Sequence, residues 1–151
     1  MKKLGVLCLV ALFVVLSGGP DAYGQKKMKK EPILWAAEDI KWETMKNGPQ
    51  GAMVAILWGN IGKGAYGAMV KLPAGFVTPL HTHSHDLKSV IVSGTMIHTP
   101  EGGTEKSYGA GSYLYIPSTE KHTTRIGADA PCVLFQESSG MFDQKPVAGK
   151  K

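Results

Sequence analysis

Short apolar runs separated by glycine and proline constrain the fold of this chain more than any other feature of its sequence. The 151 residues include 19 glycines and nine prolines, a composition that suits short strands joined by turns. Strand-like runs stand at 52–58, 90–92, 113–116 and 133–137, while 36–40 suits one helical turn. A chain of this length suits a single domain. The pattern therefore predicts an all-β antiparallel barrel or sandwich with little helix.

Three of the five histidines lie two residues apart in the stretch from Gly75 to Gly94, at His81, His83 and His85. In an extended strand, residues two apart point to the same face, with Cα atoms roughly 6.5–7 Å apart. Two imidazoles at that spacing can converge on one metal ion. A solvated loop is the alternative interpretation of such a cluster.

A second element downstream favours the metal site. It begins at Gly111, and its strand ends at Pro117, after which a turn leads to His122. Within the strand, Tyr113 and Tyr115 share one face, and Leu114 and Ile116 share the other. We expect both tyrosines to line a substrate pocket.

These two elements resemble the two motifs of the cupin superfamily, whose members fold as a small jelly-roll barrel. Gly75, His81 and His83 match the first motif, which ends at Gly94. Gly111, Pro117 and His122 match the second, with 95–110 as the gap between the motifs. The residues around the first motif also resemble those of the bacterial cupins of domain of unknown function 4437. The resemblance covers about 35–142 and implies a metal site of His81, His83 and His122.

The chain departs from the cupin pattern at the usual fourth ligand. Cupins supply a glutamate shortly after the histidine pair, whereas the candidates here are Leu87 and Lys88. The second motif also has Thr119 in place of glycine and Ile126 in place of asparagine. We expect Lys88 beside the ion, pairing with an anionic ligand. His85 is a candidate ligand or neighbour of the ion by strand parity, and the alternative is that it lies past the strand end, in the turn. The alternatives are that Lys88 points outward to water, or that Leu87 points inward instead.

Three imidazoles suit one divalent transition metal, Zn, Fe, Ni or Cu, with open positions for water or substrate. Two classes of function follow. The first is a metal-dependent oxygenase of three-histidine type that acts on a small, anionic substrate. The second is a non-catalytic cupin that binds a metal or small ligand for sensing or sequestration.

The N-terminal segment predicts export. Lys2 and Lys3 precede an apolar run at 4–16, and 22–24 offers small residues for cleavage. We expect residues 1–24 to be a signal peptide, 25–31 a flexible basic arm, 32–143 the cupin domain and 144–151 a disordered tail. The apolar run is shorter than the roughly 20 residues that span a bilayer, so no membrane anchor is expected after cleavage, and the mature protein is expected to be periplasmic or secreted.

Several other chemistries are disfavoured. Cys132 lies in an apolar run and is expected to be a buried, inert thiol. The glycines at Gly62, Gly64 and Gly67 match a dinucleotide fingerprint, but strand-type residues follow where that fingerprint requires a helix. Outside the basic arm at 25–31 the positive charge is scattered without aromatic interleaving, which disfavours nucleic-acid binding. The sequence leaves open a monomer or a homodimer.

Overall fold

The structure, a computed structural model, describes residues 31–46 and 48–147. The predicted signal peptide and most of the predicted basic arm lie outside these residues. Within 35–147 the chain is almost entirely β, with one short 3-10 helix, η1 (Ala37–Asp39). The described part of the chain holds no helix of sufficient length and apolarity to cross a membrane. The predicted all-β antiparallel fold is confirmed.

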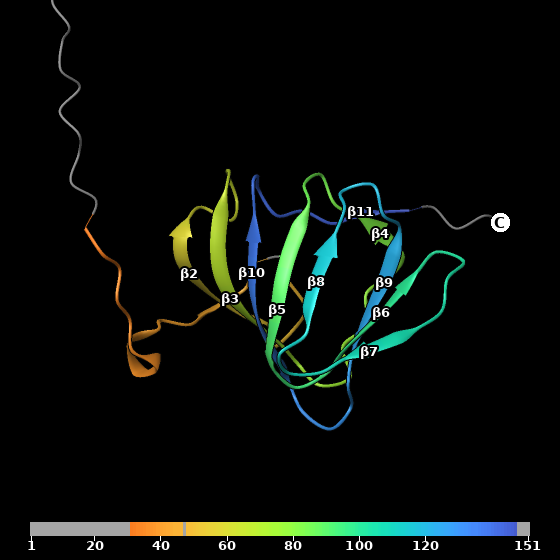
Figure 1. Cartoon of the computed structure of the whole chain (residues 1–151), viewed down its shortest axis with the longest axis horizontal. Helices are drawn as coiled ribbons and strands as arrows, with labels where there is room; N and C mark the ends of the chain where they lie inside the picture. The colour runs from red at the N-terminus through yellow and green to blue at the C-terminus, as the bar shows by residue number, and fades with distance from the viewer. Residues whose placement is uncertain (1–30, 47, 148–151) are drawn as a thin grey trace, which may run out of the picture. The chain divides into compact units, whose positions relative to one another are not determined.

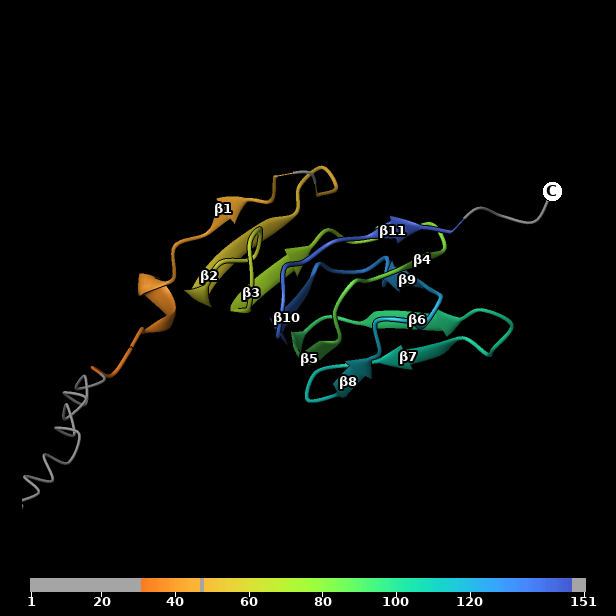
Figure 2. The ribbon, with the colours of Figure 1, turned by 90° about the horizontal axis from the view of Figure 1, so that it is seen from above.

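The strands form two sheets in which every pairing is antiparallel (Figures 1 and 2). The larger sheet has six strands, in the spatial order β1 (Glu43–Thr44), β2 (Met53–Gly59), β3 (Tyr66–Leu72), β10 (Cys132–Ser138), β5 (Leu87–Ser93) and β8 (Tyr113–Ile116). The smaller sheet has five, in the order β11 (Lys145–Pro146), β4 (His81–Thr82), β9 (His122–Ile126), β6 (Met96–Pro100) and β7 (Lys106–Tyr108).

The alternation of side chains along the strands divides each sheet into an inner and an outer face. Along β5, Leu87, Ser89 and Ile91 are buried, whereas Lys88, Val90 and Val92 are exposed. Inner-face residues of both sheets line one interior. The core is apolar and consists of Tyr66, Ala68, Val70, Ile91, Met96, Leu114, Ile126, Cys132 and Leu134. Some of these core residues also line a cavity between the sheets, and the histidines lie in its wall.

The glycine motif lies in the β2–β3 hairpin, and Cys132 begins β10. Gly62 and Gly64 lie in the connection between β2 and β3, and Gly67 lies within β3, so a strand follows where a dinucleotide site would need a helix. Cys132 is fully buried, and burial raises the pKa of its thiol to about 11. The predicted inert thiol is thus confirmed.

The predicted disordered tail is wrong at its beginning. Lys145 and Pro146 form β11, which pairs with β4, and the Val147 amide donates to the Leu80 carbonyl over 3.0 Å. The error arose because a two-residue edge strand containing proline leaves almost no sequence pattern, and its partner β4 lies far away in the sequence, with Lys145 opposite Thr82 and Pro146 opposite His81. This segment covers the part of β4 that carries His81.

Candidate metal centre

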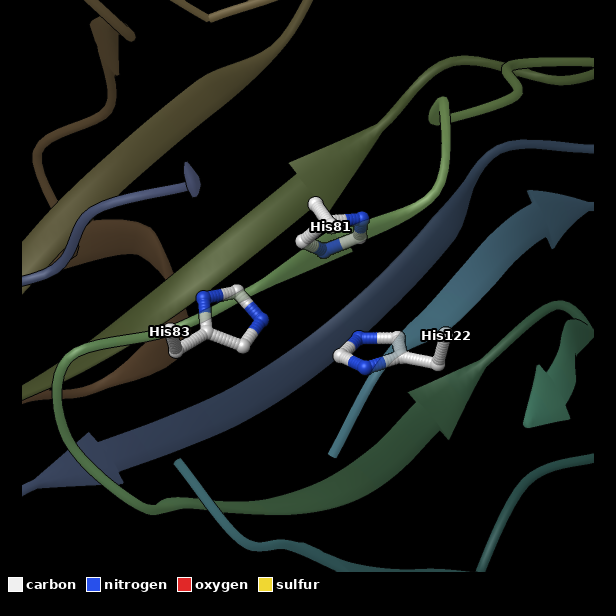
Figure 3. A group of neighbouring side chains, drawn as sticks. All are labelled: His81, His83 and His122. Atoms are coloured by element: carbon white, nitrogen blue, oxygen red, sulfur yellow. The ribbon is translucent and has the colours of Figure 1, made fainter. Parts of the chain in front are cut away.

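Three of the predicted site residues come together in the cavity between the two sheets. His81 begins β4, His83 follows that strand, and His122 begins β9, directly opposite His81 in the register. Their ring centroids lie 4.3 Å apart for His81 and His122, 4.9 Å for His81 and His83, and 5.3 Å for His83 and His122. Figure 3 shows the three rings turned toward a common space.

Backbone carbonyls fix the tautomer of all three imidazoles. The Nδ1 atoms of His81, His83 and His122 lie 2.8, 2.6 and 3.1 Å from the carbonyl oxygens of Pro79, Asp143 and Glu120, respectively. A carbonyl only accepts, so each Nδ1 must carry the hydrogen. In the neutral ring the lone pair is then on Nε2, the arrangement that metal-binding histidines adopt.

Burial keeps these rings neutral. His81, His83 and His122 are 2%, 5% and 1% exposed. Burial lowers the pKa of each, more than the carbonyl bonds raise it, and brings the pKa of His122 to about 4. A neutral imidazole is the form that binds a metal ion, so the three rings are ready ligands at neutral pH.

The donor set fits a divalent transition metal. One nitrogen from each ring lies within 4.8 Å of the others. Two metal–nitrogen bonds of about 2.1 Å bring their donors to roughly 3–4 Å, so small side-chain rotations are sufficient to close the site. Three donors leave other coordination positions of the ion open. Because all three donors are uncharged, the ion keeps its full charge for a further ligand.

The three rings line a cavity of about 910 Å³ between the two sheets. Its walls are mainly apolar, with a few polar side chains; the apolar walls include Val54, Ile56, Val70, Leu72, Leu87, Met96, Ile116, Leu134 and Phe142, and the polar groups include Ser89, Thr124 and Gln136. Among the described lining residues, Lys46 is the only lysine or arginine. A small molecule with an apolar body suits this space.

Two predicted neighbours of the ion lie elsewhere. Lys88 points outward from β5 and pairs with Glu137 at 3.4 Å, so its predicted place beside the metal is wrong. Leu87 is the residue that faces inward. His85 lies past the end of β4, beside Gly140, and does not belong to the group of converging nitrogens.

The predicted pocket tyrosines are also on the outside. Tyr113 and Tyr115 are 59% and 51% exposed, while Leu114 and Ile116 are buried. The Tyr115 hydroxyl donates to Asp86 over 2.8 Å on the outer side of the sheet. The predicted alternation of faces along this strand is correct, but the inward face is the apolar one.

His98 is a fourth buried imidazole that motif analysis does not place. Its ring centroid lies 4.7 Å from that of His122, and its Nε2 is 2.6 Å from the carboxylate of Glu120. Its Nδ1 is buried without a hydrogen-bond partner. Glu120 therefore bonds to His98 through its side chain and to His122 through its backbone carbonyl. The His98 ring packs against the ring of His122.

The segment after β10 supplies further contacts that the sequence does not signal. The Asp143 carboxylate accepts from the backbone amide and the hydroxyl of Ser84, and its carbonyl accepts from His83. The Phe142 ring lies 5.6 Å from that of His83. Gln144 places its amide 3.4 Å from Nε2 of His81. These residues belong to no motif because the long-range pairing of β11 with β4, rather than a local pattern, brings them to the histidines.

The metal-free protein is expected to lose stability as the pH falls from about 6.5 toward 4. In this window the unfolded state binds protons that the buried rings of the folded state do not, so the free energy of unfolding falls by on the order of 1–3 kcal/mol. Urea denaturation at pH 7 and pH 4.5 with a chelator checks this. His122→Gln removes the ring whose pKa burial brings to about 4, and should flatten the dependence. Equal pH dependence in both proteins contradicts the expectation.

Solved structures with this fold share little sequence identity with the chain. The polyketide cyclase RemF from Streptomyces resistomycificus superposes with a TM-score of 0.61 at 17% identity, over 82% of this chain and 88% of that one. An RmlC-like cupin from Shewanella frigidimarina gives 0.56 at 19%, over 74% and 94%. The DMSP lyase DddQ from Ruegeria pomeroyi gives 0.53 at 23%, over 67% and 56%. The predicted cupin fold is thereby confirmed.

The comparison with curated proteins found no match to the chain. The family model described as Domain of unknown function (DUF4437) matches residues 22–145, which include both histidine motifs and the segment that covers them. The barrel and its buried three-histidine group agree with this match. The chain therefore belongs to the DUF4437 family, and its fold is that of the RmlC-like cupins.

Proposed function

We propose that this protein is an exported, metal-dependent enzyme that holds one divalent transition metal at His81, His83 and His122 and acts on a small molecule in the barrel. The observation that carries the proposal is the convergence of three Nε2 lone pairs, each fixed by a backbone carbonyl, on a cavity of about 910 Å³. The bound ion would supply Lewis-acid or redox chemistry, and the protein would orient the substrate and exclude water.

An oxygenase is the reaction class that this donor set supports best. Three neutral imidazoles leave several positions of an Fe(II) ion available, as the facial sites of non-haem oxygenases do. Among the described residues, no carboxylate joins the three nitrogens, which removes one familiar general base. Two solved structures of the same fold are named as a polyketide cyclase and a DMSP lyase, so the fold is known to support catalysis.

The cavity favours a substrate with an apolar body and an anionic or oxygen-donor head. The apolar walls accommodate the body, and the dication rather than Lys88 attracts the head, since Lys88 lies on the outer face. Metal analysis of the purified protein, followed by an oxygen-consumption screen of the Fe(II) and Zn(II) forms with small carboxylates and phenols, tests this. The His122→Ala variant is the matched control. Uptake by the Fe(II) form alone supports an oxygenase.

The second candidate is a non-catalytic metal- or ligand-binding cupin, for sensing or sequestration. The observation in its favour is that, within 31–46 and 48–147, no carboxylate belongs to the group of converging nitrogens, so no acidic side chain stands beside the ion as a general base. Tyr66 donates its hydroxyl to Gln136 over 2.8 Å, and burial raises its pKa well above the ordinary value. Tight ligand binding without turnover by any metal form would select this function.

Export predicts a mature chain that starts near Gln25 outside the cytoplasm. The basic, apolar and small-residue regions of 1–24 follow one another in the order of a signal peptide. Intact-mass measurement on protein from cell fractions checks the cleavage. A cytoplasmic species that retains residues 1–24 contradicts it.

A further inference from the structure

We propose that the side-chain amide of Gln144 is the fourth protein donor at the metal centre. This inference rests on the proposed metal function of His81, His83 and His122 and deepens it. The sequence offers no glutamate at the usual position of the first motif, and among the described residues no carboxylate joins the three histidines. A donor supplied by another part of the chain can fill that place.

Gln144 lies beside a ligand atom. Its side-chain nitrogen is 3.4 Å from Nε2 of His81, the nitrogen that carries the lone pair because Nδ1 donates to Pro79. An amide that reaches this atom also reaches an ion bound to it. The oxygen and nitrogen of the amide have nearly the same shape, so rotating the group presents its oxygen to the cation.

The backbone on both sides of Gln144 is held in place. On one side, Asp143 accepts hydrogen bonds from His83 and Ser84. On the other, Pro146 is opposite His81 in the pairing of β11 with β4. Both anchors contact the stretch from His81 to Ser84, which carries two of the histidine ligands. The amide is therefore positioned by the same segment that fixes His83. A side chain positioned in this way loses little freedom when it binds an ion.

A glutamine ligand differs from a glutamate in charge, and this sets the class of substrate. Three imidazoles and one amide are all neutral, so the bound dication keeps its full charge, whereas a carboxylate would halve it. The centre should therefore prefer an anionic ligand at its remaining positions. This gives the site an electrostatic preference for anions that does not depend on Lys88.

Metal titration with Co²⁺ tests the proposal, since its visible spectrum reports the donors directly. Gln144→Ala is expected to weaken Co²⁺ binding by roughly tenfold and to change the spectrum. Gln144→Glu should tighten binding by about tenfold and weaken the binding of added acetate to the Co²⁺ form. Met141→Ala is the control, because this exposed, uncharged side chain belongs to the same segment. It should leave affinity and spectrum unchanged.

Two outcomes overturn the proposal, and they are distinguishable. If the wild-type protein binds Co²⁺ and both Gln144 variants match it in affinity and spectrum, the fourth donor is not Gln144 and the three-histidine centre stands. If the wild-type protein binds no Co²⁺ at neutral pH, the metal function fails together with the assignment of Gln144. Circular dichroism of each variant excludes loss of folding as the cause of a weaker site.

Discussion

Replacing His122 with alanine is expected to weaken Zn²⁺ or Co²⁺ binding by about a thousandfold, or about 4 kcal/mol. His122 begins β9 opposite His81, and its ring lies within 4.3 to 5.3 Å of the rings of His81, His83 and His98. Removing it leaves two histidine ligands and a gap on one side of the ion. Competition titration against a chelator measures the loss.

His85→Ala is the matched control for this change. His85 belongs to the same His-x-His-x-His run, yet it lies beside Gly140 and outside the converging group. It should therefore retain wild-type affinity. Added metal should also raise the unfolding temperature of the wild type and of His85→Ala, but not that of His122→Ala, because only a folded state that binds the ion is stabilised by it. Equal losses of affinity in both variants would assign the ion to a different site.

The barrel and its three histidines could be predicted because their signals are local. The spacing of two between His81 and His83 has a direct meaning in a strand, where both side chains reach one face. Gly75, Gly94, Gly111 and Pro117 mark where strands end and turns begin. The pairing of His81 with His122 is long-range, but the order of the two motifs implies it.

The predictions that failed depended on which face of a strand points inward. A strand alternates with a period of two, so placing Lys88 rather than Leu87 beside the ion reverses every residue of β5. The tyrosines of β8 were misplaced for a related reason. Their alternation with Leu114 and Ile116 was visible in the sequence, but either face could have been the inner one. The apolar pair faces the core because burying it costs no unpaired hydroxyl.

The contacts made by the C-terminal segment could not be predicted, since long-range strand pairing and one backbone carbonyl bring this segment to the site. Asp143 holds His83 through a carbonyl that any residue would carry. Gln144 has its position through the pairing of β11 with β4. His98 is buried beside His122 because β6 pairs with β9, and no spacing in the sequence records that neighbour relation.

Gly75 and Gly94, which bound the first motif, have similar backbones in different surroundings. Their φ angles are +70° and +77°, in the left-handed region that side chains disfavour. A Cβ atom on Gly75 would have no heavy atom within 4 Å outside its chain neighbours. On Gly94 it would overlap the carbonyl oxygen of Pro131 and lie 2.8 Å from Cα of Cys132. The two positions therefore separate backbone strain from steric overlap.

Gly94→Ala is expected to lower the free energy of unfolding by about 3–5 kcal/mol, and Gly75→Ala by only about 1–2 kcal/mol. Both variants incur the cost of a left-handed alanine, but only at Gly94 must the backbone at the start of β10 move away. That movement disturbs the pairing of β10 with both β3 and β5 at the centre of the larger sheet. Urea denaturation of the two metal-free variants at pH 7 measures the difference. Similar losses would show that strain alone requires glycine at the end of the motif, and that β5 and β10 do not approach as closely as described.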